Sequence, residues 1–159
     1  MFRILYTLIS SSLFLLVHAS PGPEEYLKLH NDIRADRNAP PLTWNNDLAM
    51  YAQEWANRCV RRHSHGEYGE NLAWGYGEDY GVEAAVQFWI NERNYLDPSS
   101  PQASHYTQMI WKDTKELGCA VSWCPYLYSG EVAYRTGQMH VCEYFPRGNV
   151  IDDFQDNVE

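Results

Sequence analysis

The hydrophobic residues of this chain repeat with one period before Lys112 and with another after it. In residues 46–59 the apolar side chains recur three or four positions apart, which is the spacing of one face of an α-helix. In residues 119–123 apolar and small residues alternate, as in a strand with two different faces. Helices placed first and a small antiparallel sheet placed later are typical of the α+β class.

The same periodicity predicts the individual elements. Amphipathic helices are expected over residues 23–37, 46–59 and 82–95, and a short helix is expected over residues 105–111 with Ser104 as its N-cap. Residues 63–80 are rich in glycine, histidine and tyrosine and lack a helical period, so they are expected to form a long ordered loop. Residues 126–137 are expected to be a polar connection between two strands.

Three segments divide the chain. Residues 1–19 combine one charge at Arg3, an apolar run and small residues that end at Ala19, which predicts a cleaved signal peptide. That run falls short of the roughly 20 apolar residues of a membrane span, and no later stretch approaches that length. We expect one domain over residues 20–150 and an acidic, disordered C-terminal tail over residues 151–159. A secreted, extracellular monomer is predicted.

The overall charge limits the partners. The formal net charge is −9, and it becomes more negative when Arg3 leaves with the signal peptide. An excess of acidic groups opposes binding to nucleic acid and to anionic membrane surfaces. An apolar ligand inside the protein remains compatible with this surface.

The cysteines number four, which is even, in a chain with an expected signal peptide. Two disulfides are therefore expected in preference to a metal site or free thiols. Three pairings are possible. Cys119 and Cys124 are five positions apart and would face opposite sides of one extended strand, so a bond between these two is disfavoured. The other two pairings remain open on this argument.

Histidines and glutamates recur in the middle of the chain, in segments that mix polar and apolar residues. His63 and Glu70 lie in the expected loop, Glu92 follows the third expected helix, and His105 opens the short one. Two neutral imidazoles can bind a divalent transition metal, and carboxylates can coordinate it directly or orient the imidazoles. Zinc is the first candidate. The alternative is a structural hydrogen-bond network of two histidine–glutamate pairs.

Four sequence motifs occur in a fixed order, namely HNDIR at residues 30–34, GENL at 69–72, HYTQMIW at 105–111 and MHVCEYFPRGNV at 139–150. Together they resemble the motifs of the CAP superfamily, which includes plant pathogenesis-related class 1 proteins, insect venom antigens and animal cysteine-rich secretory proteins. The resemblance implies a three-layer α-β-α sandwich, disulfides Cys59 with Cys124 and Cys119 with Cys142, and a central cleft lined by His63, Glu70, Glu92 and His105. It does not imply that the fold requires a metal.

Lipid binding is the second activity that the resemblance implies, because family members are associated with sterols and fatty acids. Phe88, Trp89, Tyr95 and Leu96 are the candidate apolar wall. Sterol-binding relatives carry aromatic residues in the loop before the HYTQ motif, whereas residues 97–103 of this chain contain none. Three further departures from the family pattern are Ser104, His140 and Glu143.

The sequence thus predicts a non-enzymatic, secreted, pathogenesis-related-like binding module for a sterol or another small lipid, with a cleft able to bind zinc or another divalent cation. One alternative is a metal-dependent hydrolase or protease that uses His63 and His105. The other is a defence or virulence protein that binds an extracellular receptor and has no lipid ligand.

Overall fold

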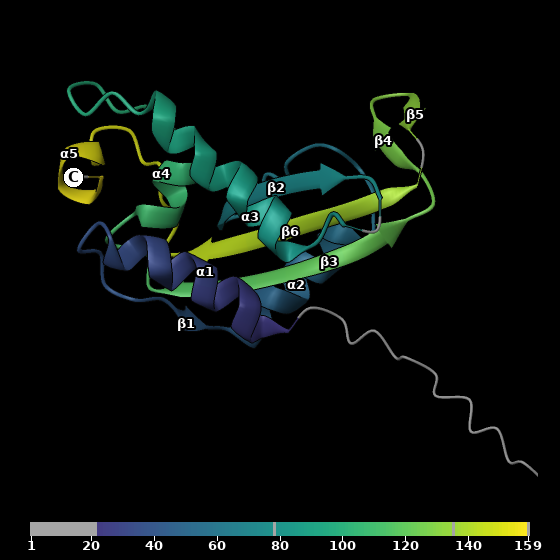
Figure 1. The fold of residues 1–159 in the computed structure, drawn as a ribbon, viewed down its shortest axis with the longest axis horizontal. Helices are drawn as coiled ribbons and strands as arrows, with labels where there is room; N and C mark the ends of the chain where they lie inside the picture. Colours follow the sequence, from purple (N-terminus) through teal and green to yellow (C-terminus); the bar gives the residue numbers. More distant parts are fainter. Residues whose placement is uncertain (1–21, 78, 135, 159) are drawn as a thin grey trace, which may run out of the picture.

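In the computed structural model, which describes residues 22–158 except 78 and 135, a four-stranded sheet lies between two layers of helices (Figure 1). The expected α+β class and three-layer sandwich are confirmed. The expected signal peptide lies outside the described residues. The elements are α1 (Pro23–Ala35), β1 (Thr43–Trp44), α2 (Asn46–Ala56), β2 (Gly69–Gly75), α3 (Val82–Asn91), the 3-10 helix η1 (Glu92–Tyr95), α4 (His105–Ile110), β3 (Glu116–Cys124), β4 (Leu127–Ser129), β5 (Val132–Tyr134), β6 (Gly137–Phe145) and α5 (Phe154–Asn157).

The strands of the sheet follow the order β1-β3-β6-β2. β6 pairs antiparallel with β3 and with β2, whereas β1 pairs parallel with β3. The sequence predicted antiparallel pairing alone, because a two-residue strand such as β1 leaves no periodic signal. β4 and β5 form a separate hairpin where the sequence predicted a polar connection, so that expectation is wrong.

The strand β2 occupies part of the segment that was expected to be a loop. Leu72 packs in the cluster on the α2 side of the sheet, and its neighbour Ala73 packs in the cluster on the side of α1, α3 and α4. Both faces of β2 are buried, so its sequence does not alternate between apolar and polar residues. The expected long loop is therefore interrupted by an edge strand.

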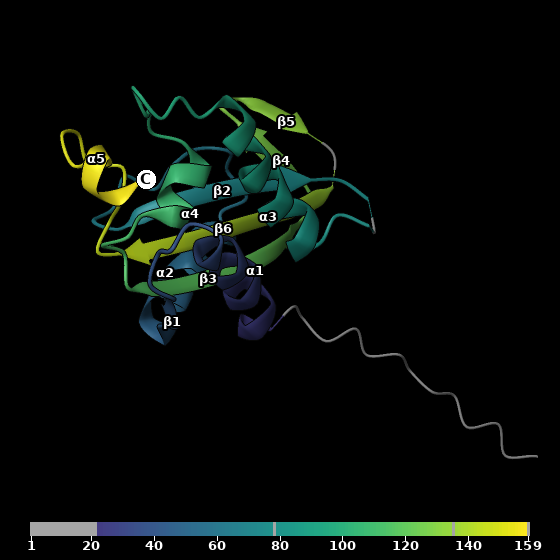
Figure 2. The same ribbon diagram turned by 60° about the vertical axis from the view of Figure 1, so that its left-hand side comes forward.

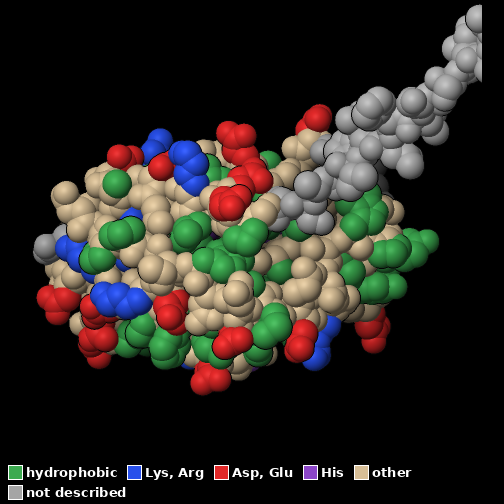
Figure 3. Space-filling view, turned by 90° about the horizontal axis from the view of Figure 1, so that it is seen from below, with side chains coloured by type: hydrophobic (Ala, Val, Ile, Leu, Met, Phe, Trp, Pro, Cys, Tyr) green, Lys and Arg blue, Asp and Glu red, His purple; other side chains and the backbone are tan. Residues whose placement is uncertain are grey.

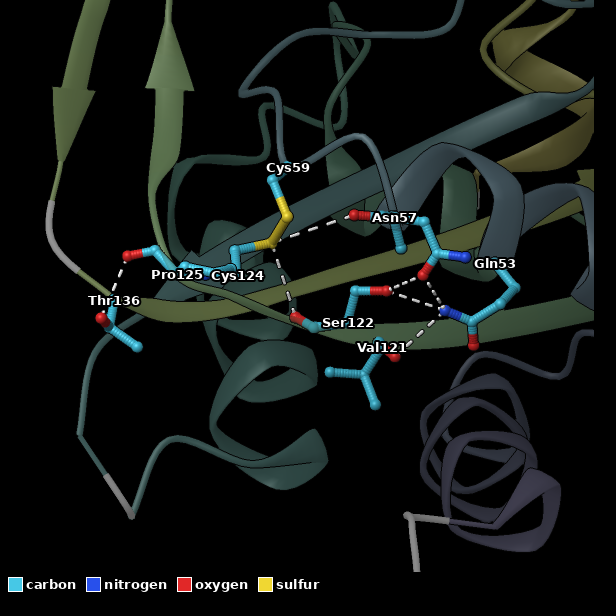
Figure 4. Close-up of a disulfide and its surroundings, with 9 residues drawn as sticks. Gln53, Asn57, Cys59, Val121, Ser122, Cys124, Pro125 and Thr136 are labelled. Carbon is cyan, nitrogen blue, oxygen red and sulfur yellow. Dashed lines mark hydrogen bonds between the residues drawn. A yellow bond between two sulfur atoms is a disulfide. The ribbon is translucent and has the colours of Figure 1, made fainter.

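The helix α2 approaches the sheet closely because β3 carries Gly118 at the crossing. A β-carbon built there would lie 2.2 Å from the backbone nitrogen of Ala49. The end of α2 is also tied to the end of β3 by the disulfide Cys59–Cys124, beside which Gln53 donates a hydrogen bond to Ser122 Oγ (Figure 4).

The second disulfide joins the neighbouring strands β3 and β6 through Cys119 and Cys142, which face each other in the register. The two bonds are the pairs that the family resemblance implies. They lie on opposite sides of the sheet, since Cys119 and Cys142 pack with α1 and α3 whereas Cys124 packs with α2.

The acidic tail is ordered over its described residues, so the expectation of disorder is wrong. The side chain of Asn157 accepts a hydrogen bond from Asp113 N, and the ring of Phe154 packs edge-on against Trp111 at a centroid distance of 5.1 Å. Val158 is buried. α5 consequently lies beside α4 (Figure 2).

Candidate functional site

The site begins with α4, which is positioned from both ends. Ser104 caps its first turn by accepting a hydrogen bond from Thr107 N, as the sequence predicted. At the other end the fully buried guanidinium of Arg34 donates to the carbonyls of Met109 and Trp111, at 2.9 and 2.8 Å. The Met109 carbonyl belongs to the last turn of α4, whose carbonyls lack intrahelical donors, and the carbonyl of the C-cap Trp111 also accepts from Thr114 N at 3.1 Å. Arg34 therefore fixes the helix that presents His105.

His105 and Glu92 form the first of two histidine–glutamate pairs. Nδ1 of His105 lies 2.6 Å from Oε1 of Glu92, and the backbone N–H of His105 donates to Oε2 at 2.7 Å. The ring stacks on Trp89 at a centroid distance of 6.1 Å. Glu92 is thus held by the segment whose histidine it orients.

His63 and Glu70 form the second pair. Nδ1 of His63 lies 2.6 Å from Oε1 of Glu70, which also accepts the backbone N–H of Ser64 at 3.0 Å. The hydrogen bond to Glu70 raises the pKa of His63 above its ordinary value. Burial alone would raise the pKa of Glu70, but the hydrogen bonds from His63 and Ser64 outweigh burial and lower it. The pair therefore favours a charged imidazolium beside a carboxylate.

All four predicted residues line one cleft of about 380 Å³, to which Asn71, Ala103, Ser104 and Asn149 also contribute. In both histidines Nδ1 is engaged by a glutamate, and Nε2 makes no hydrogen bond to any described residue. Across residues 22–158, apart from 78 and 135, no group of three or more histidine, cysteine or acidic residues is arranged to hold a metal ion. The cleft offers two imidazoles with oriented, open nitrogens.

Two asparagines support the cleft, and the sequence assigned a role to neither. Asn71 donates to the carbonyl of His105 at 3.0 Å. Asn149 donates to the carbonyl of Ser104 at 2.9 Å and accepts from Thr107 Oγ1 at 2.6 Å. Both residues lie within the recognised motifs, and that membership is the only signal that could have identified them.

Glu143, one of the departures from the family pattern, lies directly beside Glu70 in the sheet. The two residues face each other across β2 and β6. Glu143 is fully buried. Burial and the nearby charge of Glu70 raise the pKa of Glu143 to about 10. At neutral pH this carboxyl is therefore uncharged.

An apolar cavity of about 560 Å³ adjoins the cleft, where the connection from α3 to α4 projects from the body (Figure 2). Three of the four predicted lipid contacts line it, namely Phe88, Tyr95 and Leu96. The fourth, Trp89, does not, since its ring is fully buried and its indole nitrogen donates to the carbonyl of Leu72 at 3.0 Å. Trp89 is a core residue against which the ring of His105 stacks.

On its other side the cleft adjoins a polar hollow of about 260 Å³, which shares His63, Glu70 and Asn149 with it. His65 and Arg147 belong to this hollow.

No described helix is long and apolar enough to cross a membrane. On the face seen from below, acidic side chains are scattered and lysine and arginine form no continuous patch (Figure 3).

Comparison with known proteins places this site in a family. Residues 27–144 match the model of the cysteine-rich secretory protein family, CAP. Pathogenesis-related protein 1C of Nicotiana tabacum is 37% identical over 161 residues, which cover 92% of this chain and 90% of that protein. The chain belongs to the CAP family, and within it resembles the pathogenesis-related class 1 proteins.

Solved structures agree with this assignment. The structure of Na-ASP-1 superposes with a TM-score of 0.66 at 27% identity, over 80% of this chain and 39% of that one. The structure of NaASP2 with Zn²⁺ superposes with a TM-score of 0.60 at 22% identity, over 80% of each chain. At that level of identity the second likeness concerns the fold alone.

Proposed function

We propose that this chain is a secreted, non-enzymatic binding module whose ligand is a sterol or another small lipid. The cavity beside Phe88, Tyr95 and Leu96 carries this proposal, since its volume of about 560 Å³ falls within the range of small-molecule sites. Phe88 and Tyr95 are 57% and 88% exposed, although aromatic side chains gain from burial. A lipid in the cavity would bury them. The description of the family as secretory supports an extracellular location.

The experiment is a titration of the mature protein with a fluorescent sterol. Phe88→Ser is expected to weaken binding because it removes an exposed aromatic wall while leaving the core intact. Met50→Ser is the matched control, since Met50 is similarly exposed, at 61%, but lies on α2 on the other side of the sheet. Binding that is absent, or equally weak in both variants, would refute the sterol proposal.

We further propose that the cleft binds a divalent cation, with zinc as the first candidate, through His63 and His105. Each Nδ1 is engaged by a glutamate, which leaves Nε2 as the coordinating atom and assigns Glu70 and Glu92 the role of orienting the rings. A metal held by two imidazoles would keep water in its remaining positions and act as a Lewis acid when bound. NaASP2, which shares the fold, has been determined with Zn²⁺.

Calorimetric titration with zinc tests this proposal directly. We expect binding to weaken as the pH falls, because imidazoles must lose their protons to coordinate, and to disappear in the His63→Ala/His105→Ala variant. The hydrolase alternative predicts peptide or ester turnover that a chelator abolishes and that His105→Ala eliminates. Zinc binding without such turnover would leave the binding module as the function.

A further inference from the structure

The charges that line the apolar cavity indicate which lipid headgroup it would accept. This inference rests on the lipid-binding function proposed above. The charged side chains that line the cavity are the carboxylates of Glu92 and Asp97. Among the residues that the structure describes, no lysine, arginine or histidine belongs to the lining. The other polar lining residues are uncharged, namely Asn91, Ser100, Gln102 and Ser104.

The two carboxylates occupy different depths. Glu92 is partly buried and its oxygens accept from His105 and from the backbone N–H of Tyr106, so it forms the end of the cavity nearest the cleft. Asp97 is exposed at the rim, where its Oδ1 accepts from both the backbone N–H and the hydroxyl of Ser99. Those bonds to Ser99 lower the pKa of Asp97. A backbone hydrogen bond from Ser100 lowers this pKa further, so Asp97 carries its negative charge at the rim.

Neighbouring groups provide little to hold an anion. The side-chain nitrogen of Gln102 is already engaged by Ser100. Arg93, the nearest cation along the chain, lies on η1 and is exposed outside the lining. A carboxylate headgroup in this cavity would meet two like charges and no charged donor, whereas an ammonium would meet opposite charges.

We propose that the cavity selects single-chain amphiphiles with a positively charged headgroup, that is, long-chain amines. The alkyl chain would cover Phe88 and Leu96, and the ammonium would lie beside Asp97. The ring of Tyr95 adds an aromatic face that attracts cations. Fatty acids of the same chain length bind more weakly.

The test compares dodecylamine, dodecanol and dodecanoate, which share one alkyl chain and differ in headgroup charge. Each is titrated below its micelle-forming concentration, by displacement of a fluorescent ligand, into the wild type, Asp97→Asn and Glu54→Gln. Asp97→Asn keeps an acceptor for Ser99 and removes only the charge. Glu54→Gln removes the same charge from an exposed position of α2.

We expect the affinity to fall from the amine to the alcohol to the acid. Asp97→Asn should weaken dodecylamine by roughly fivefold, the upper end for one exposed ion pair, and leave dodecanol unchanged. Glu54→Gln should change neither. Added salt should weaken the amine alone.

Other outcomes would overturn the inference. One is that dodecanoate binds as tightly as dodecylamine. A second is that Asp97→Asn leaves the ratio of the affinities for dodecylamine and dodecanol unaltered. A third is that none of the three amphiphiles binds to a protein that still binds the sterol. Absence of binding for the sterol and all three amphiphiles would instead remove the lipid-binding function itself.

Discussion

His140 lies in the core, and it should make the protein acid-sensitive. The imidazole is fully buried on the side of the sheet covered by α1. Its Nδ1 lies 2.7 Å from Tyr26 Oη, and its ring makes a T-shaped contact with the ring of Tyr80. Nε2 has no partner among the described residues. Burial without a neighbouring carboxylate lowers the pKa of His140 to about 4.

Because the pKa of His140 is lowered in the folded protein, the contribution of His140 to stability decreases at acidic pH. Between about pH 4 and the ordinary value of 6.5 the unfolded chain binds the proton and the folded chain does not. The free energy of unfolding is therefore highest above pH 6.5 and declines as the pH falls. At 1.36 kcal/mol per pKa unit, His140 should account for about 2 kcal/mol of lost stability at pH 5.

Other groups contribute to the same pH curve. His30 is buried, with Nδ1 donating to the Tyr26 carbonyl and Nε2 accepting from Tyr144, and burial lowers its pKa to about 4 as well. The raised pKa values of His63 and Glu143 act in the opposite direction, because these groups hold a proton more tightly in the folded chain. The wild-type curve alone therefore cannot isolate His140.

A comparison of two variants does isolate it. Tyr26→Phe removes the hydroxyl and keeps the imidazole, whereas Tyr26→Phe/His140→Phe removes both polar partners and leaves an apolar pair. Urea unfolding measures the free energy of unfolding of both variants at pH 7.5 and at pH 5. The free energy of the double variant minus that of Tyr26→Phe should be about 2 kcal/mol larger at pH 5 than at pH 7.5. A difference between the two variants that stays constant over this range would refute the assignment of acid sensitivity to His140.

Three further predictions concern the framework around the site. Replacing Cys119 and Cys142 by serine should lower the free energy of unfolding by roughly 3 kcal/mol, since the bond closes a loop of 23 residues, and chemical denaturation will measure it. Arg34→Met should cost about 3 kcal/mol or more in the same assay because it strands buried carbonyls; a near-neutral effect would contradict its role in fixing α4. Asn157→Ala should cost about 1 kcal/mol and speed hydrogen exchange at Asp113 N, and unchanged exchange would show that the tail does not hold this turn.

The sequence predicted those parts of the fold in which a local pattern matches the structure. α1, α2 and α3 each bury one stripe of apolar residues, and the N-cap Asn45 accepts from Asp47 N as its residue type suggests. β2 escaped prediction because it is buried on both faces and begins and ends with glycine. α5 was not predicted because its residues contact Trp111 and Asp113, more than forty positions earlier in the chain, and local charge density gives no indication of such contacts.

The candidate site shows the same division. Glu70 and His105 lie within the motifs, His63 and Glu92 follow from the family resemblance, and the structure brings all four to one cleft. The sequence left open whether the glutamates coordinate a metal or orient the rings. That choice depends on which ring nitrogen each carboxylate contacts, a matter of rotamers and of the path of the chain between the motifs. The burial of Trp89 depends in the same way on how α3 turns against the sheet.

Glu92 links the two proposed binding events. It lines both the apolar cavity and the cleft, and its carboxylate orients His105, a proposed metal ligand. An ammonium beside Asp97 and a cation on His105 Nε2 would place two positive charges on the two sides of Glu92, and like charges repel each other. Since linkage between two ligands is reciprocal, a long-chain amine should weaken zinc binding by the factor by which zinc weakens the amine. Zinc affinities that are identical with and without saturating dodecylamine would show that the cavity and the cleft act independently.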